Sequence, residues 1–232
     1  MTIKRNMDVF WNYEGLTGPN HWHELCEWYA DGAKFPLQSP IALAKKLSFT
    51  SSDLLTLNYV SEKFTEKEFK NTIHFLPYDT RSFLIFEGVE YHLTDIHFHL
   101  PSEHSIDGNF YDLEIHLVHT NDKNENLVLA SLFNLIDKDC KAEDIPDSTW
   151  DFLKHEEWFN PSIFLPERKS YFNYLGSLTT PPTFGPVQWF VFDQVRNMPK
   201  AYINLFKEEI LENNHRPLQD GKNRKVFYYG AR

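Results

Sequence analysis

Three histidines in two nearby segments could bind one metal ion. His97 and His99 stand two residues apart, and His116 follows in the next segment. Side chains of an extended strand alternate between its faces, so His97 and His99 point the same way. If the two segments pair as antiparallel strands, all three imidazoles lie on one surface. Three histidines leave one position of a tetrahedral zinc open to water, which is typical of a catalytic site.

Two carboxylates stand where they could orient these imidazoles. Glu114 precedes His116 by two residues on the same strand face, and Asp95 precedes His97 in the same way. A metal-bound imidazole needs an acceptor for its other N–H, which fixes its tautomer and raises its basicity. An isolated His-x-His is more often a surface or core pair than a metal site, but the matching carboxylates favour zinc.

The chain resembles the α-class carbonic anhydrases in a series of motifs that follow the family's order. These are Gly18-Pro-Asn-His-Trp22, Gln38-Ser-Pro-Ile41, His97-Phe-His99, Pro101-Ser-Glu-His104, Glu114-Ile-His-Leu-Val-His119, Gly176-Ser-Leu-Thr-Thr-Pro-Pro182 and Arg216-Pro-Leu-Gln219. The resemblance implies a carbonate dehydratase, a zinc lyase in which zinc-bound hydroxide hydrates CO2 reversibly to bicarbonate and a proton. It also implies inhibition by aromatic sulfonamides.

The resemblance assigns catalytic roles to a hydroxyl and a carboxylate. Thr179 would accept a hydrogen bond from the zinc-bound hydroxide and donate its own hydrogen to Glu103, which aims the hydroxide at CO2. Zinc would bring the bound water to a pKa of about 7. Without the surrounding motifs, Thr179 would be an ordinary loop residue and Glu103 an ordinary surface acid.

Each zinc ligand is expected to have its own hydrogen-bond acceptor. The resemblance implies Asp95 for His97, the backbone carbonyl of Asn214 for His99, and Glu114 for His116. The family has glutamine where this chain has Asp95, and the added negative charge should raise the pKa of the zinc-bound water slightly. His104 and His119 are expected to be buried structural histidines.

CO2 is apolar, and the resemblance implies an apolar wall beside the metal. By motif position the substrate pocket would contain Val118, Leu129, Leu178, Thr180, Val187 and Trp189. A general core role would suit several of these equally well, Leu129 and Val187 above all.

The histidine that exports protons in fast members of the family is expected to be absent. Counting back from His97 without a gap places Asn71 at the shuttle position, and an asparagine side chain does not carry a proton. His74, three residues later, could face the cleft as a substitute or merely line its wall. An imidazole suits proton transfer near neutrality because its unperturbed pKa is about 6.5.

Length and composition favour one large β domain. The chain has 232 residues, of which 16% are aromatic, and contains no linker or repeat that would mark a boundary. We therefore expect one domain over residues 1–232, mainly β, with a large, mostly antiparallel twisted central sheet and a few peripheral helices. The strongest strand patterns are 90–100, 109–119, 127–135 and 187–193, with a further run over 54–59. Pro199 begins an expected helix whose Ile203, Phe206 and Ile210 form one apolar face.

Charge and cysteine content restrict partners and compartment. The net charge of −10 argues against a nucleic-acid partner, and no apolar run is long enough for a membrane helix. Asp31 and Thr183 appear where exported relatives have a disulfide, which leaves Cys26 and Cys140 unmatched. Together with an N-terminus that lacks the pattern of a signal peptide, this indicates a cytoplasmic protein. The sequence does not indicate an oligomeric state.

Two other classes of function remain open at this point. A non-catalytic binding module with the same fold would lack zinc, so metal analysis separates it from the enzyme. A zinc hydrolase that cleaves esters would use the same metal, so the two are separated by comparing CO2 hydration with ester cleavage on one preparation.

Overall fold

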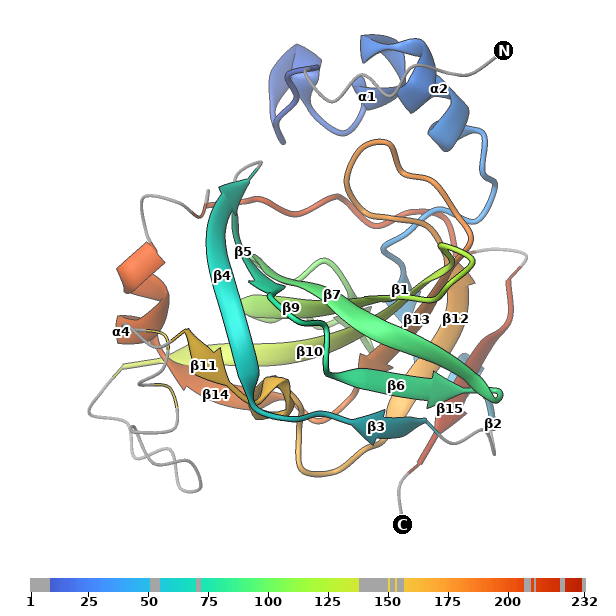
Figure 1. The fold of residues 1–232 in the computed structure, drawn as a ribbon. Helices are drawn as coiled ribbons and strands as arrows, with labels where there is room; N and C mark the ends of the chain where they lie inside the picture. The colour runs from blue at the N-terminus through green and yellow to red at the C-terminus, as the bar shows by residue number, and fades with distance from the viewer. Residues whose placement is uncertain are drawn as a thin grey trace.

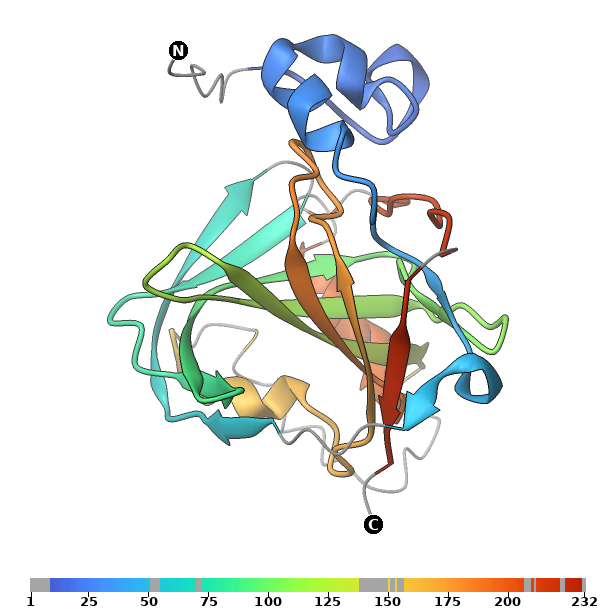
Figure 2. The same cartoon turned by 90° about the vertical axis from the view of Figure 1, so that its right-hand side faces the viewer.

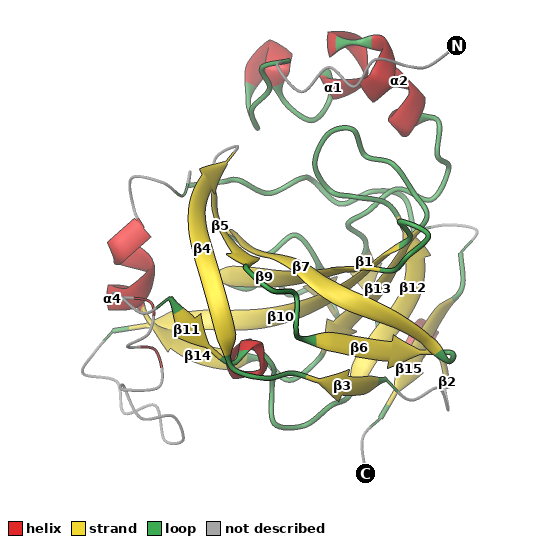
Figure 3. Ribbon diagram, in the orientation of Figure 1, coloured by secondary structure: helices red, strands yellow, loops and turns green. Residues whose placement is uncertain are grey.

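The computed structural model of the chain is dominated by one large twisted sheet (Figures 1 and 3). The N-terminal part of the chain forms a short helical segment outside the sheet. The structure describes residues 9–50, 55–69, 72–137, 150, 153, 157–206, 210, 212–221 and 224–230. Most neighbouring strands in the sheet run antiparallel, and a few pairs are parallel. The predicted fold class is confirmed.

The strands follow one another across the sheet in an order that differs from their order in the sequence. Their bounds are β1 Ala42–Leu43, β2 Phe49–Thr50, β3 Thr56–Asn58, β4 Glu62–Phe69, β5 Thr72–Pro77, β6 Phe83–Phe86, β7 Val89–His99, β8 Ser105–Ile106, β9 Leu113–Thr120, β10 Asn126–Ile136, β11 Trp158–Phe159, β12 Tyr171–Gly176, β13 Val187–Phe192, β14 Arg196–Pro199 and β15 Val226–Tyr229. The main path is β11-β4-β5-β7-β9-β10-β13-β12-β15-β2, while β14 pairs with β10, and β3 joins through β6 to β7. β1 and β8 form a separate pair.

Helical elements are short. They are α1 Trp22–Leu25, α2 Glu27–Ala33 and α4 Lys200–Ile203, with 3-10 turns at Gly15–Thr17, Lys45–Leu47, Pro161–Phe164 and Asn204–Phe206. The helix expected after Pro199 does begin there, but the described part changes to a 3-10 turn after Ile203. Its expected apolar face is nevertheless buried, because Ile203, Phe206 and Ile210 are each 5–6% exposed.

Alternating residues give the two faces of β7 and β9 different chemistry. The two strands pair so that His97 lies opposite His116 and His99 opposite Glu114. The residues between them, Ile96, Phe98, Ile115 and Leu117, point to the other face and are fully buried in a large apolar cluster. That cluster fixes the register, because a slip of one residue would bury histidines in it and expose its apolar members.

The N-terminal helical segment packs over one end of the sheet (Figure 2). Trp11, Trp22 and Tyr29 form a small buried cluster, and the Trp22 indole N–H donates to the backbone carbonyls of Asn12 and Thr17. Helix α2 approaches the loop after β12 so closely that a Cβ at Gly32 would lie 1.6 Å from the carbonyl oxygen of Pro182. Only glycine permits this contact.

Candidate metal centre and active site

Three imidazoles converge where the end of β7 lies beside the middle of β9. Ring centroids of His97 and His99 are 5.1 Å apart, those of His97 and His116 are 5.2 Å apart, and those of His99 and His116 are 4.5 Å apart. His99 and His116 are buried, whereas the side chain of His97 is 14% exposed. The predicted antiparallel pairing is what brings these rings together.

One nitrogen of each ring is already engaged in a hydrogen bond, as the sequence predicted. The acceptors are Asp95 Oδ2 for His97 Nδ1, the carbonyl oxygen of Asn214 for His99 Nδ1 and Glu114 Oε1 for His116 Nε2, each at 2.8 Å. Carboxylates and carbonyls only accept hydrogen bonds, so the engaged nitrogens carry the hydrogens. The nitrogens with lone pairs are therefore Nε2 of His97, Nε2 of His99 and Nδ1 of His116.

These three nitrogens fit a tetrahedral zinc. They come from a group whose ligand atoms all lie within 4.8 Å of one another. Zn–N bonds of 2.0–2.1 Å at tetrahedral angles require nitrogens about 3.3 Å apart, and His97 Nε2 lies 3.3 Å from His116 Nδ1. His99 Nε2 is buried without a hydrogen-bond partner, a costly state for a polar atom that a metal ion would relieve.

Burial keeps two of the expected ligand imidazoles, those of His99 and His116, neutral. Desolvation, aided by the neighbouring His99, lowers the pKa of His116 to about 3. Desolvation also lowers the pKa of His99 below its ordinary value, although Glu103 opposes the change. Because only a neutral imidazole has a lone pair for a metal, these rings are ready to bind one at neutral pH.

Glu114 is the most heavily hydrogen-bonded side chain at the site. Besides the ring of His116, it accepts from the ring of His104 at 2.6 Å and from the backbone N–H groups of Glu103 and His104 at 2.8 Å. Burial by itself would raise the pKa of Glu114, but His104 and His116 hold it well below the ordinary value. A fully buried anion with four donors is rigidly placed, so the direction of the His116 ring is fixed.

Glu103 and Thr179 lie beside the histidines, as the resemblance implied. The Thr179 hydroxyl hydrogen-bonds to the Glu103 carboxyl, and the backbone N–H of Arg216 donates to Glu103 Oε1 at 2.8 Å. Burial raises the pKa of Glu103, while His99, Thr179 and Arg216 act in the opposite direction. Glu103 Oε2 lies 3.6 Å from His99 Nε2, so this carboxyl adjoins the metal position.

His74 lies next to the metal ligands and not on a distant wall. Its Nδ1 is 2.8 Å from Asp95 Oδ1, and its ring centroid is 5.0 Å from that of His97. Its side chain is 15% exposed. Asn71 falls outside the described residues, so its position relative to the cleft stays a prediction.

The apolar wall forms on the histidine face of β10 and β13, with one correction. The Trp189 ring centroid is 4.9 Å from that of His116, and Trp189 packs in one cluster with Val187, Val118 and Leu178. The prediction for Leu129 was wrong. It pairs with Leu117 and is buried in the apolar cluster on the other face.

Val128 takes the place that was predicted for Leu129. It pairs with Val118 on β9 and with Trp189 on β13, and it belongs to the same cluster as both. Since the side-chain period of a strand is two, an assignment shifted by one residue selects the wrong face. Thr180 lies in the loop after β12 and is partly buried, near the predicted pocket residues in sequence.

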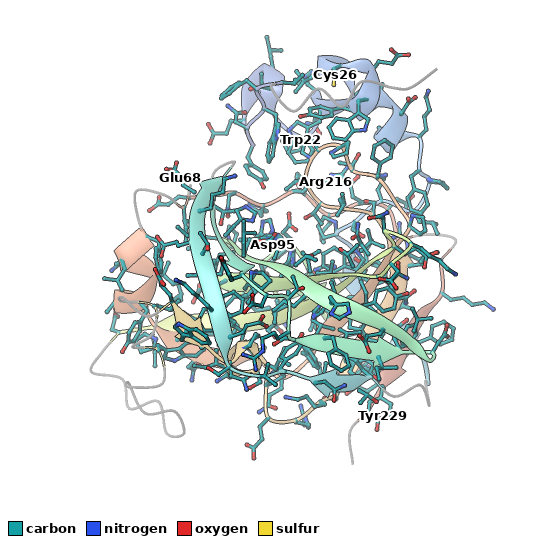
Figure 4. All side chains as sticks on the ribbon, viewed as in Figure 1. Trp22, Cys26, Glu68, Asp95, Arg216 and Tyr229 are labelled. Carbon is teal, nitrogen blue, oxygen red and sulfur yellow. The ribbon has the colours of Figure 1, made fainter. Side chains whose placement is uncertain are left out.

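From the sequence, no site role was assigned to three further residues. Tyr13 lies near Glu103, and burial together with that carboxyl raises the pKa of Tyr13 well above its ordinary value. Arg216 contacts Glu103 through its backbone, and its guanidinium lies 5.7 Å from the Trp22 ring (Figure 4). Tyr174 hydrogen-bonds to His104 Nε2 at 2.7 Å. Tyr13 and Arg216 stand far from the histidine motifs in sequence, and only the fold brings them there.

Comparison with known proteins assigns the chain to a family. The family model of the eukaryotic-type carbonic anhydrases matches residues 17–230. This chain belongs to that family. Membership implies the hydration of CO2, and a carbonic anhydrase of Nostoc sp. is 31% identical over 232 residues, covering 96% of this chain and 87% of the relative. A carbonic anhydrase of Neisseria gonorrhoeae is 29% identical over 216 residues, which cover 90% of this chain and 84% of the relative.

Solved structures of the family share the fold. The α-carbonic anhydrase of Thermovibrio ammonificans, solved with the inhibitor sulfanilamide, has a TM-score of 0.81 and 29% identity, covering 94% of this chain and 99% of the other. A dioscorin complexed with ascorbate has a TM-score of 0.82 and 28% identity, and the match covers 96% of this chain and 99% of the dioscorin chain. Among the described residues of this chain, no helix has the length and apolar character needed to cross a membrane.

Proposed function

We propose that the protein is a zinc-dependent carbonic anhydrase that converts CO2 reversibly to bicarbonate and a proton. The observation that carries this proposal is the convergence of three ring nitrogens, of which two lie 3.3 Å apart, the spacing of a tetrahedral zinc site, and the third is buried without a partner. When bound, zinc supplies hydroxide at neutral pH by lowering the pKa of a bound water to about 7. An ion held by three protein nitrogens keeps the open position that such chemistry needs.

The residues around the histidines orient the reactants. Thr179 donates its hydroxyl hydrogen to Glu103, which is kept in place by the backbone N–H of Arg216. The hydroxyl oxygen of Thr179 would accept a hydrogen bond from the zinc-bound hydroxide. This arrangement would orient a lone pair of the zinc-bound hydroxide toward the carbon of CO2 and so favour attack there. Val118, Leu178, Val187 and Trp189, together with Val128, offer the apolar surface that an uncharged CO2 requires.

Export of the proton is proposed to occur without the family's shuttle histidine. Asn71 occupies that position in the gapless alignment and does not carry a proton. His74 is engaged with Asp95 through Nδ1, which supports a role near the metal in preference to one at the mouth of the cleft. Transfer to dissolved buffer would then limit turnover.

A reducing compartment is proposed for the protein, with the cytoplasm as the simplest case. The segments that exported relatives join by a disulfide are in contact here without one, since Gly32 packs against Pro182 and Gln38 donates to the carbonyl of Thr183. Cys26 is a free thiol. These contacts support a fold that does not depend on oxidation.

Metal analysis and CO2 hydration on one preparation test the proposal. The wild-type protein should contain about one zinc per chain, and His116→Ala should lose both zinc and activity. His119→Gln is the matched control, because His119 is buried on the same strand but bonds to Tyr59 and faces away from His116. Full activity of the wild type without zinc would overturn the assignment.

Sulfonamide inhibition offers a second test of the same site. The Thermovibrio relative was solved with sulfanilamide, and here an aromatic sulfonamide is proposed to bind zinc as an anion while the oxygen of Thr179 accepts its N–H. Inhibition should compete with other zinc-binding anions. Inhibition that is independent of such anions would contradict this site.

A non-catalytic binding module is the second candidate, because a dioscorin with a similar fold was solved in complex with a small molecule, ascorbate. Dioscorin dioA3 of Dioscorea japonica is 32% identical over 238 residues, covering 96% of this chain and 86% of the relative. The two candidates differ in one measurement. A pure protein that contains zinc and hydrates CO2 is the enzyme, and one that takes up no zinc is the binding module.

A further inference from the structure

The carboxylate that holds His97 is itself held by a second histidine. Strand β5 pairs with β7 so that His74 lies opposite His97. Asp95 is two residues before His97, and its two oxygens accept from the two rings, Oδ1 from His74 Nδ1 and Oδ2 from His97 Nδ1, both at 2.8 Å. The result is a chain of contacts from His74 through Asp95 to a metal ligand.

Both of these hydrogen bonds end on an ionised carboxylate. Burial would raise the pKa of Asp95, but His97 and His74 together lower it below the ordinary value. An ionised carboxylate has no hydrogen to give, so both Nδ1 atoms are donors. This fixes the His97 tautomer with its lone pair on Nε2, the atom that lies 3.3 Å from His116 Nδ1.

The three ligand partners differ in how they are themselves fixed. The partner of His99 is a backbone carbonyl, which the chain holds in place. The partner of His116 is Glu114, fully buried and bonded to four donors. The partner of His97 is a side chain that is 20% exposed and lies beside a register shift in the β7–β9 pairing. Among the described residues, only His74 donates to the other oxygen of Asp95.

We propose that His74 is a positioning residue for the metal: by donating to Asp95 it fixes the carboxylate that orients His97, and so slows the loss of zinc. This inference rests on the proposed zinc-dependent function. A carboxylate bonded at one oxygen alone could turn about its Cβ–Cγ bond and let the His97 ring tilt. Bonded at both oxygens, it holds the ring toward the metal.

The experiment measures zinc dissociation from the holoprotein into excess chelator. His74→Phe keeps an aromatic ring beside His97 but removes the donor, and it should raise the dissociation rate about tenfold, at the lower end of what loss of such a partner costs. His74→Asn is the matched variant, because its amide places an N–H near the position of Nδ1, and it should remain close to wild type. Equal rates for wild type and His74→Phe would overturn the proposal.

A double-mutant cycle separates positioning from a general structural role. Asp95→Ala should itself speed zinc loss, and adding His74→Phe to it should cause no further change, because the path from His74 runs through Asp95. Additive effects of the two substitutions, or equal rates for the Phe and Asn variants, would contradict the inference.

Failure of this inference is distinguishable from failure of the proposed function. A wild-type protein that binds no zinc defeats the proposed function. A wild-type protein that holds zinc and hydrates CO2, but whose zinc loss is insensitive to His74, defeats only the positioning role.

Discussion

The two faces of the β7–β9 pair differ in what their buried side chains must satisfy. On one face, His97, His99 and His116 each have one hydrogen-bonded nitrogen and one directed toward a shared point. On the other face, Ile96 and Phe98, together with their neighbours on β9, have no polar atoms in their side chains and are fully buried. The same backbone therefore supports two different kinds of packing.

This difference separates stability from function within one pair of strands. Apolar burial is non-directional, so the apolar face tolerates small changes in shape at modest cost. The polar face depends on direction, because a buried donor without an acceptor costs the desolvation of that group. Substitutions on the apolar face should therefore affect stability alone, whereas substitutions on the polar face should also affect metal binding.

The largest effect is expected for Glu114→Ala, on the polar face. It leaves four buried donors without an acceptor and should lower the free energy of unfolding by about 3–5 kcal/mol, as measured by urea unfolding of the metal-free protein. Zinc affinity should fall about 10- to 100-fold. Glu114→Gln keeps one carbonyl oxygen as an acceptor, so its free energy of unfolding and its zinc affinity should both fall less than those of the alanine variant. A loss below about 1 kcal/mol for the alanine variant would mean that this network is not rigid.

Asn71→His tests whether turnover is limited by the lack of a histidine that carries the proton away from the metal site. Turnover at low buffer concentration should rise by roughly tenfold or more, and wild-type turnover should increase with the concentration of an imidazole buffer. A large loss of turnover in His74→Ala that imidazole restores would instead identify His74 as the carrier. The gapless alignment would then be wrong.

A smaller effect is expected for Ile115→Val, on the apolar face between Glu114 and His116. Removal of one methylene from a fully buried site should cost about 1 kcal/mol. Zinc content and turnover should stay at the wild-type values, because the side chain points away from the metal. Loss of zinc in this variant would show that the two faces are not independent.

No effect is expected from reductant. Because the contact between Gly32 and Pro182 forms without a disulfide, the melting temperature should be the same with and without dithiothreitol. A clear fall in melting temperature on reduction would reveal a disulfide that involves Cys26 or Cys140. Cys140 falls outside the described residues.

Much of the metal centre could be predicted from the sequence because strand alternation is a local rule. The offsets of Asp95 and Glu114 from their histidines were sufficient to predict both hydrogen bonds. The resemblance to a family supplied the carbonyl of Asn214, more than a hundred residues from His99, and the structure bears it out.

The error at Leu129, and the contacts that were not foreseen, occurred where the sequence has no local signal. Leu127, Val128, Leu129 and Ala130 are all buried, so β10 lacks the polar and apolar alternation that would have assigned Leu129 to its face. The contact between His74 and Asp95 depends on the pairing of β5 with β7, which no spacing within either strand predicts. The position of Tyr13 depends in turn on how the N-terminal segment packs over the sheet.

The central claim, that three histidine nitrogens form a zinc site that hydrates CO2, is tested most directly by titrating the metal-free protein with zinc while CO2 hydration is measured. Activity should rise in proportion to added zinc and level off at about one zinc per chain. Activity that is present before zinc is added, or that stays absent once one zinc is bound, would contradict the account.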